Sequence, residues 1–201
     1  MDTYRTIKAL SEGLFIEKRS KFIAIALPVC TLDEIKVYIE KYQKQYYDAR
    51  HVCYAYMLGH ERKIFRANDN GEPSGTAGKP ILGQINSNEL TNILIVVVRY
   101  FGGIKLGTSG LIQAYKAAAA EAIASAEIVE MTVDDDVEVA FEYPFMNDVM
   151  RIVKEEEPQI VSQSYDMDCL MCLRIRRSLM SRLRERLAKV ETLRFVKGND
   201  L

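Results

Sequence analysis

The chain has 201 residues, a formal net charge of −1 and 48% apolar residues. This length allows one large or two small domains, and the apolar content is sufficient for a hydrophobic core without disulfides or metals. No apolar run reaches the roughly 18 residues of a membrane-spanning helix. The first residues also lack the apolar segment of a signal peptide, so we expect a cytoplasmic protein without a membrane partner.

Residues 1–133 show the pattern of an α/β domain. Thr31 and Glu34 form a capping box at the start of its first expected helix. Residues 92–99 contain a continuous apolar run, which is typical of a central strand covered on both faces. Apolar alternation and helical spacing predict strands at 4–9, 14–18, 21–29, 51–58, 63–68, 92–99 and 128–133, and helices at 32–46, 80–85 and 111–126.

Three adjacent carboxylates, Asp134, Asp135 and Asp136, mark the expected domain boundary, because like charges repel and prefer water. The predicted domains are therefore 1–133 and 134–201. In the second domain, Ser178 is expected to cap the last helix. The expected elements are strands at 137–143, 159–165, 168–176 and 192–196 and helices at 144–157 and 178–190. Their order, βαββαβ, is that of a ferredoxin-like fold, so we expect an α+β protein of two domains.

Charge is unevenly distributed in this second domain. Residues 134–172 hold eleven acids and two bases, whereas residues 173–197 hold nine bases and two acids. We expect the two segments to neutralise each other; the alternative is a basic face for nucleic acid. Cys169 and Cys172 form a CxxC motif, but alternation along a strand places them on opposite faces. They are therefore expected to be ordinary cysteines, without a metal or a cofactor.

Eight of the eleven glycines lie between Gly71 and Gly110, and seven of these are in two loops that span 69–80 and 99–110. Glycine clusters favour tight turns or a close approach of backbone to a ligand. Basic and hydroxyl side chains accompany them, so we predict an anion- or nucleic-acid-binding surface; the alternative is that the glycines only form turns. The predicted side chains are Arg66, Ser74, Thr76, Lys79, Arg99, Lys105, Thr108 and Ser109. The predicted loop backbone is that of Gly71, Gly75, Gly78, Gly102, Gly103, Gly107 and Gly110.

Neither loop matches a standard nucleotide motif. Pro73 and Pro80 replace the leading glycine and the Ser/Thr of a P-loop, and the glycine spacing of the second loop is not GxGxxG. The interpretation that remains possible is an anion site formed by free backbone amides at the helix start near Gly107. No catalytic set is evident, since a Cys53–His51 pair on one strand is better explained by a buried, hydrogen-bonded histidine. We therefore expect no catalytic residues, and a binding protein rather than an enzyme.

The loop segments 69–82 and 96–107 resemble the signature of the YigZ/IMPACT family, and segments 18–22 and 51–56 also fit it. The resemblance implies a two-domain member of the bacterial branch. It implies that the first domain is similar to the second domain of a small-subunit ribosomal protein, and that the pair is similar to domains IV and V of elongation factor G. It also implies that eukaryotic relatives restrain a translation-initiation kinase through a partner protein. Those relatives carry an additional N-terminal domain that is absent here, so we do not expect that partner interaction for this chain.

The leading hypothesis is thus a translation-linked regulatory protein that binds RNA or the ribosome without catalysis. One alternative is an enzyme or binding protein for a phosphorylated small molecule or nucleotide. Another is a regulatory module that binds a protein partner. We expect the two loops to meet on one side of the first domain's sheet.

Overall fold

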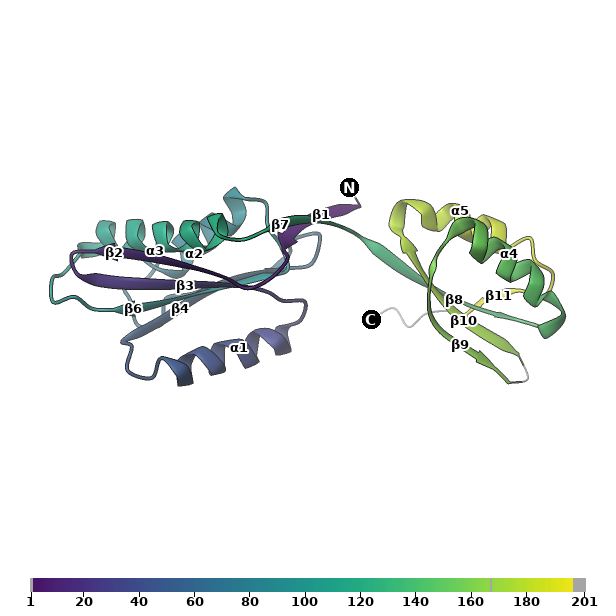
Figure 1. Cartoon of the computed structure of the whole chain (residues 1–201), viewed down its shortest axis with the longest axis horizontal. Helices are drawn as coiled ribbons and strands as arrows, with labels where there is room; N and C mark the ends of the chain where they lie inside the picture. Colours follow the sequence, from purple (N-terminus) through teal and green to yellow (C-terminus); the bar gives the residue numbers. More distant parts are fainter. Residues whose placement is uncertain (1, 167, 197–201) are drawn as a thin grey trace. The chain divides into compact units, whose positions relative to one another are not determined.

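The computed structural model describes residues 2–166 and 168–196 (Figure 1). Contacts divide the chain into two compact units. The N-terminal unit runs from Tyr4 to Met131, and the C-terminal unit runs from Thr132 onward and also takes in Asp2 and Thr3. None of the described helices is long and apolar enough to cross a membrane.

A five-stranded sheet forms the centre of the N-terminal unit, in the order β2-β3-β6-β4-β5. Its strands are β2 (Ser11–Glu17), β3 (Ser20–Pro28), β4 (His51–Leu58), β5 (Ile64–Asn68) and β6 (Ile93–Tyr100). Two short strands, β1 (Thr3–Ile7) and β7 (Ile128–Thr132), pair in a separate two-stranded sheet.

Every strand pair in the five-stranded sheet is antiparallel, so the α/β assignment of this unit is wrong. The helical crossovers do connect parallel strands, but these strands are not neighbours. β3 and β4 run parallel with β6 between them, and β5 and β6 run parallel with β4 between them. A helical crossover predicts that the two strands it connects run in the same direction. It does not predict that another strand lies between them, because that depends on the order of the whole sheet.

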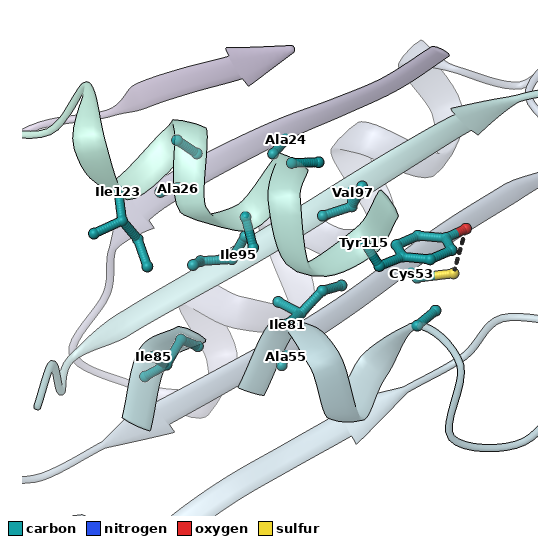
Figure 2. Packing of buried hydrophobic residues seen from close by; sticks show 14 of the residues in the cluster. Ala24, Ala26, Cys53, Ala55, Ile81, Ile85, Ile95, Val97, Tyr115 and Ile123 are labelled. Carbon is teal, nitrogen blue, oxygen red and sulfur yellow. Dashed lines mark hydrogen bonds between the residues drawn. The ribbon is translucent and has the colours of Figure 1, made fainter. Parts of the chain in front are cut away.

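Three helices cover the two faces of this sheet. The helix α1 (Leu32–Gln45) lies on one face, and α2 (Gly78–Ser87) and α3 (Gly107–Ala124) lie on the other (Figure 1). The central strand β6 alternates between two cores: Ile93, Ile95 and Val97 pack toward α2 and α3, and its other apolar residues pack toward α1. Figure 2 shows Ile95 and Val97 beneath α3. The prediction of a central strand covered on both faces is confirmed.

Alanines allow α3 to pack closely on the sheet. Ala114, Ala118, Ala119 and Ala122 are fully buried, and a β-carbon on Gly13 of β2 would lie 2.3 Å from the backbone nitrogen of Ala122. The predicted capping box of Thr31 and Glu34 is present at α1. By contrast, α2 and α3 begin before their predicted starts at residues 80 and 111, so glycines assigned to the loops belong to helices.

The C-terminal unit has the predicted order βαββαβ. Its elements are β8 (Asp134–Phe141), a short 3₁₀ turn (Tyr143–Phe145), α4 (Met146–Glu156), β9 (Gln159–Tyr165), β10 (Cys169–Arg176), α5 (Arg177–Leu187) and β11 (Arg194–Val196). The sheet order is β11-β8-β10-β9, and all its pairs are antiparallel. Alternate residues of β8 and β10 form one core with α4 and α5.

Ion pairs between the acidic and basic segments stabilise this unit, as predicted. Arg174 contacts Asp136 at 2.7 Å, and Arg177 contacts Asp135 at 2.9 Å. These contacts help to explain why the aspartates lie in β8 rather than in a solvated linker, since an arginine of β10 compensates Asp136 and the first residue of α5 compensates Asp135. Arg182 and Arg186 pair with the buried Glu156, at 2.5 and 2.6 Å.

Two further predictions concern single residues of this unit. Cys169 is buried in the core and Cys172 lies on the opposite side of β10, so the prediction that the two cysteines lie on opposite faces of a strand is confirmed. Ser178 does not cap α5, because the helix already begins at Arg177 and its first turn has no side-chain cap.

Candidate functional site: a pocket between the two glycine-rich loops

The two glycine-rich loops meet at one cavity of the N-terminal unit. The cavity has a volume of about 470 Å³, and we call it the loop pocket. One wall comes from the segment between β5 and α2, another from the segment between β6 and α3, and the start of β4 completes it. Its lining residues are Arg50, His51, Gly71, Glu72, Pro73, Arg99, Phe101, Lys105, Leu106, Gly107, Thr108 and Leu111.

The first loop is organised by Asp69, which follows β5. Its Oδ1 accepts hydrogen bonds from the backbone N–H groups of Ala77 and Gly78, at 3.0 and 2.8 Å, and its Oδ2 accepts from Gly75 at 2.8 Å. Burial opposes the charge of this carboxylate, but the three amides outweigh it and hold the pKa of Asp69 below its usual value. The amides that begin α2 are therefore already satisfied by the chain itself and are not available to a ligand.

A buried polar network forms the floor of the loop pocket. Glu72 accepts hydrogen bonds on Oε1 from Arg99 Nη1 at 2.6 Å and from the Tyr115 hydroxyl at 2.9 Å. Glu72 and Arg99 are 9% and 7% exposed. Because their surroundings have a low dielectric constant, either charge without the other would destabilise the fold. The Arg99 guanidinium also lies over the rings of Phe22 and Phe101, at 5.5 and 5.6 Å from their centroids. Arg99 is thus a rigid part of the wall.

His51 and Cys53 extend this network along β4. His51 Nδ1 lies 2.8 Å from the Asn70 carbonyl oxygen, and His51 Nε2 lies 3.9 Å from Glu72 Oε1. The Cys53 thiol donates to the Asp69 carbonyl oxygen and lies 3.3 Å from the Tyr115 hydroxyl (Figure 2). Burial raises the pKa of Cys53 to about 12, so the thiolate required of a nucleophile is disfavoured.

The second loop leads directly into α3, and this helix has a different start from α2. The N-cap residue is Leu106, and no side chain makes a cap hydrogen bond there. Gly107 has a φ of 74°, a left-handed conformation that glycine adopts at low cost. The first amides of α3 therefore point out of the helix beside Leu106, Gly107 and Thr108 of the pocket wall, where the helix dipole favours an anion.

The structure brings some of the predicted site residues together and separates others. Among the predicted side chains, Arg99, Lys105 and Thr108 line the loop pocket, as do the glycines Gly71 and Gly107. Thr76 is buried and donates to the Pro73 carbonyl oxygen at 2.7 Å, which is a structural role. The remaining predicted side chains lie outside the lining and are exposed: Arg66, Ser74, Lys79 and Ser109.

The other predicted glycines serve the shape of the loops. Gly75 and Gly103 have φ values of 78° and 88°. A β-carbon on Gly78 would lie 2.4 Å from the Asn68 nitrogen, and one on Gly102 would lie 2.1 Å from the Arg19 carbonyl carbon. Gly110 is in α3, close to the Leu106 side chain. Turn geometry and close packing therefore explain these five glycines without a ligand.

Sequence reasoning missed Arg50 and Phe101 and assigned His51 only a structural role. Arg50 and His51 are distant in sequence from both loops, and β4 reaches the pocket only because it pairs with β6, where His51 is opposite Arg99. Glu72 of the first loop is a further buried residue of the site that the sequence did not single out. The sequence near Glu72 gives no sign of its burial, because a glutamate is buried only where the fold supplies a cationic partner. Among the described residues, no group of three or more His, Cys, Asp or Glu side chains is arranged to hold a metal ion.

Comparisons with known proteins agree with this fold and these loops. The Impact N-terminal domain model matches residues 18–123, which include both loops. The chain is 36% identical to IMPACT family member YvyE of Bacillus subtilis (strain 168) over 157 residues, 78% of this chain and 72% of that protein. It is 31% identical to IMPACT family member YigZ of Escherichia coli (strain K12), over 77% of this chain and 76% of that protein. A crystal structure of a hypothetical protein covers the full length of both chains at 26% identity and a TM-score of 0.78. The loops that build the pocket are thus part of a shared domain, and the chain belongs to the IMPACT family.

Proposed function

We propose that this protein is a translation-linked regulatory protein that binds RNA, free or within the ribosome, through a phosphate held in the loop pocket. The observation that carries the proposal is the uncapped start of α3 beside Lys105 and Arg50 in one cavity. Backbone amides, the positive end of a helix dipole and two flexible cations together favour a phosphate group.

The charge available to a ligand comes mainly from Arg50 and Lys105. Both side chains are exposed, and neither forms an ion pair within the described part of the chain. Arg99 is already neutralised by Glu72, so it contributes rigidity and hydrogen-bond donors more than net charge. A site of this kind binds phosphate without specifying a base, which suits RNA backbone.

Family membership supports the link to translation, which is what the resemblance to the YigZ/IMPACT family implies. We further propose domains at 1–133 and 134–201, the first like elongation factor G domain IV and the second ferredoxin-like. The strand order β11-β8-β10-β9, with two helices on one face, supports the second assignment. A cytoplasmic location and a non-enzymatic role belong to the same proposal.

The test compares two charge reversals, Lys105→Glu inside the loop pocket and Lys79→Glu outside it. Binding of a ribosomal RNA fragment is measured by fluorescence anisotropy at several salt concentrations. Lys105→Glu should weaken binding about tenfold and reduce the salt slope by about one. Lys79→Glu should change it little. The proposal is wrong if the wild-type protein does not bind RNA, or if both variants weaken binding equally.

The size of the loop pocket favours one second candidate, a phosphorylated small molecule or nucleotide. Its volume of about 470 Å³ lies in the range of small-ligand sites. A thermal-shift screen of nucleotides and sugar phosphates separates the two candidates. A specific small ligand raises the Tm at concentrations above its Kd, and this rise should be absent in Lys105→Glu.

A further inference from the structure

The turn between β2 and β3 has an unusual composition for its geometry. Lys18 and Arg19 are its two central residues, between the paired residues Glu17 and Ser20, and their φ values are 45° and 64°. Left-handed φ at both positions is the signature of a type I′ turn, which strongly prefers Asn-Gly. Two long cationic side chains are therefore held in a backbone conformation that disfavours any β-carbon. Backbone strain of this kind is concentrated at functional sites.

This turn packs against the second glycine-rich loop. The Gly102 N–H donates to the Ser20 hydroxyl oxygen at 3.1 Å, and the backbone of Gly102 lies so close to Arg19 that a β-carbon would not fit. Gly102 lies between Phe101 and Lys105 in the sequence, and the side chains of Phe101 and Lys105 line the loop pocket. The strained turn thus borders the wall of the loop pocket.

The charges of the turn are not compensated. Lys18, Arg19 and Lys21 are exposed, and across residues 2–166 and 168–196 none of them forms an ion pair or a side-chain hydrogen bond. Glu17 is the one acid among residues 17–21. The arginines of the C-terminal unit, in contrast, pair extensively with acids. Uncompensated cations beside an anion pocket indicate a ligand with more than one negative group.

An aromatic side chain, Phe101, lines the loop pocket and directly precedes Gly102, which contacts the turn. Phe101 is 46% exposed, and its ring is in contact range of the Arg99 guanidinium, which limits its movement. An exposed, supported aromatic ring next to cations is the arrangement on which single-stranded nucleic acids stack a base.

We propose that the Lys18–Arg19 turn is a second phosphate-binding site, which together with the loop pocket seats two phosphates of single-stranded RNA while Phe101 stacks a base between them. This inference rests on the proposed function and adds the form of the RNA and a second contact. Both side chains are exposed on a turn that contacts the second glycine-rich loop, so an RNA strand that leaves the loop pocket reaches them.

The experiment uses two variants of the turn and a fluorescein-labelled 12-nucleotide oligouridylate as the probe. Lys18→Asn with Arg19→Gly supplies the residues that a type I′ turn prefers and removes both charges. Its Tm should rise by about 2–4 °C. Its affinity should nevertheless fall about tenfold, with a salt slope smaller by about 1.4 for two lost contacts to a single strand.

A second turn variant separates charge from strain. Lys18→Gln with Arg19→Gln removes the charges but keeps both β-carbons, so it should lose the same affinity without the rise in Tm. Lys41→Asn with Lys116→Asn removes two exposed cations from α1 and α3 and serves as the matched control, with affinity close to wild type.

The outcomes distinguish this inference from the proposed function. If both turn variants bind the oligouridylate as wild type does while Lys105→Glu weakens binding, the second site is wrong and the proposed function stands. Tighter binding of a double-stranded RNA of the same length also overturns the inference. If Lys105→Glu has no effect on any RNA, the proposed function itself fails.

Discussion

Arg99 and Glu72 form a buried ion pair that joins the two glycine-rich loops, with 2.6 Å between Nη1 of Arg99 and Oε1 of Glu72. The pair connects the end of β6 to the first loop, so the shape of the loop pocket depends on it. Because both side chains are almost fully buried, the loss of one leaves the other charge without compensation.

We therefore expect Glu72→Ala to lower the free energy of unfolding by about 3–5 kcal/mol. Glu72→Gln should lower it less, since the amide oxygen still accepts from Arg99 and Tyr115. Urea denaturation measures both variants. The double variant Glu72→Ala with Arg99→Met should be more stable than Glu72→Ala, because it removes the isolated charge. A double variant that is less stable than Glu72→Ala contradicts this interpretation.

Gly102 and Gly83 provide a matched pair of glycine substitutions. Gly102→Ala places a β-carbon 2.1 Å from the Arg19 backbone, so the β2–β3 turn must shift and stability should fall by more than about 1 kcal/mol. Gly83 lies within α2 with open space around it, and Gly83→Ala should stabilise by about 0.5–1 kcal/mol. Thermal unfolding followed by circular dichroism measures both. Equal effects of the two substitutions are incompatible with the close approach at Gly102.

Asp69 makes the stability of the N-terminal unit depend on acid pH. Its pKa is lower in the folded than in the unfolded state, so its contribution is present above the unfolded value of about 3.9 and is lost as pH falls through the folded value. Asp69→Asn places an NH₂ group against a backbone N–H and should cost about 1–2 kcal/mol at pH 7. The difference from wild type should shrink below about pH 4. Asp33→Asn, at the exposed start of α1, is the matched control for removal of a carboxylate. A constant difference at every pH argues against the amide cap.

The four cysteines should differ in reactivity toward iodoacetamide. Cys30 is exposed, whereas Cys53 is buried with its pKa raised to about 12. At pH 8, mass spectrometry should detect rapid alkylation of Cys30 and alkylation of Cys53 only on unfolding. Fast alkylation of native Cys53 is the result that would revive a Cys53–His51 nucleophile.

Local patterns were sufficient to predict most elements of this protein. The strand at His51–Leu58, the capping box of α1 and the βαββαβ order of the C-terminal unit are all found where the sequence predicts them. Helix starts were predicted less well, because the first amides of α2 are capped by Asp69, which lies eight residues before the N-cap residue Ala77. Such a cap is not a local signal, since it depends on how the loop folds back.

The candidate site was predicted in part. The expectation that the two loops adjoin agrees with the loop pocket, but of eight predicted side chains only Arg99, Lys105 and Thr108 line it. Thr76 is buried and donates to a carbonyl oxygen, and Arg50, the residue before β4, lines the site. A list of basic and hydroxyl residues does not reveal which of them are exposed, buried or already paired.

The sequence by itself determined the secondary structure and the core, because apolar periodicity and turn chemistry act over a few residues. The tertiary structure decided what the glycine-rich loops offer to a ligand. The start of α2 is filled by Asp69 and the charge of Arg99 is cancelled by Glu72, whereas the start of α3 is uncapped beside Lys105. Whether a charge or an amide is available depends on its neighbours in space, and strand pairing brought those neighbours from distant parts of the chain.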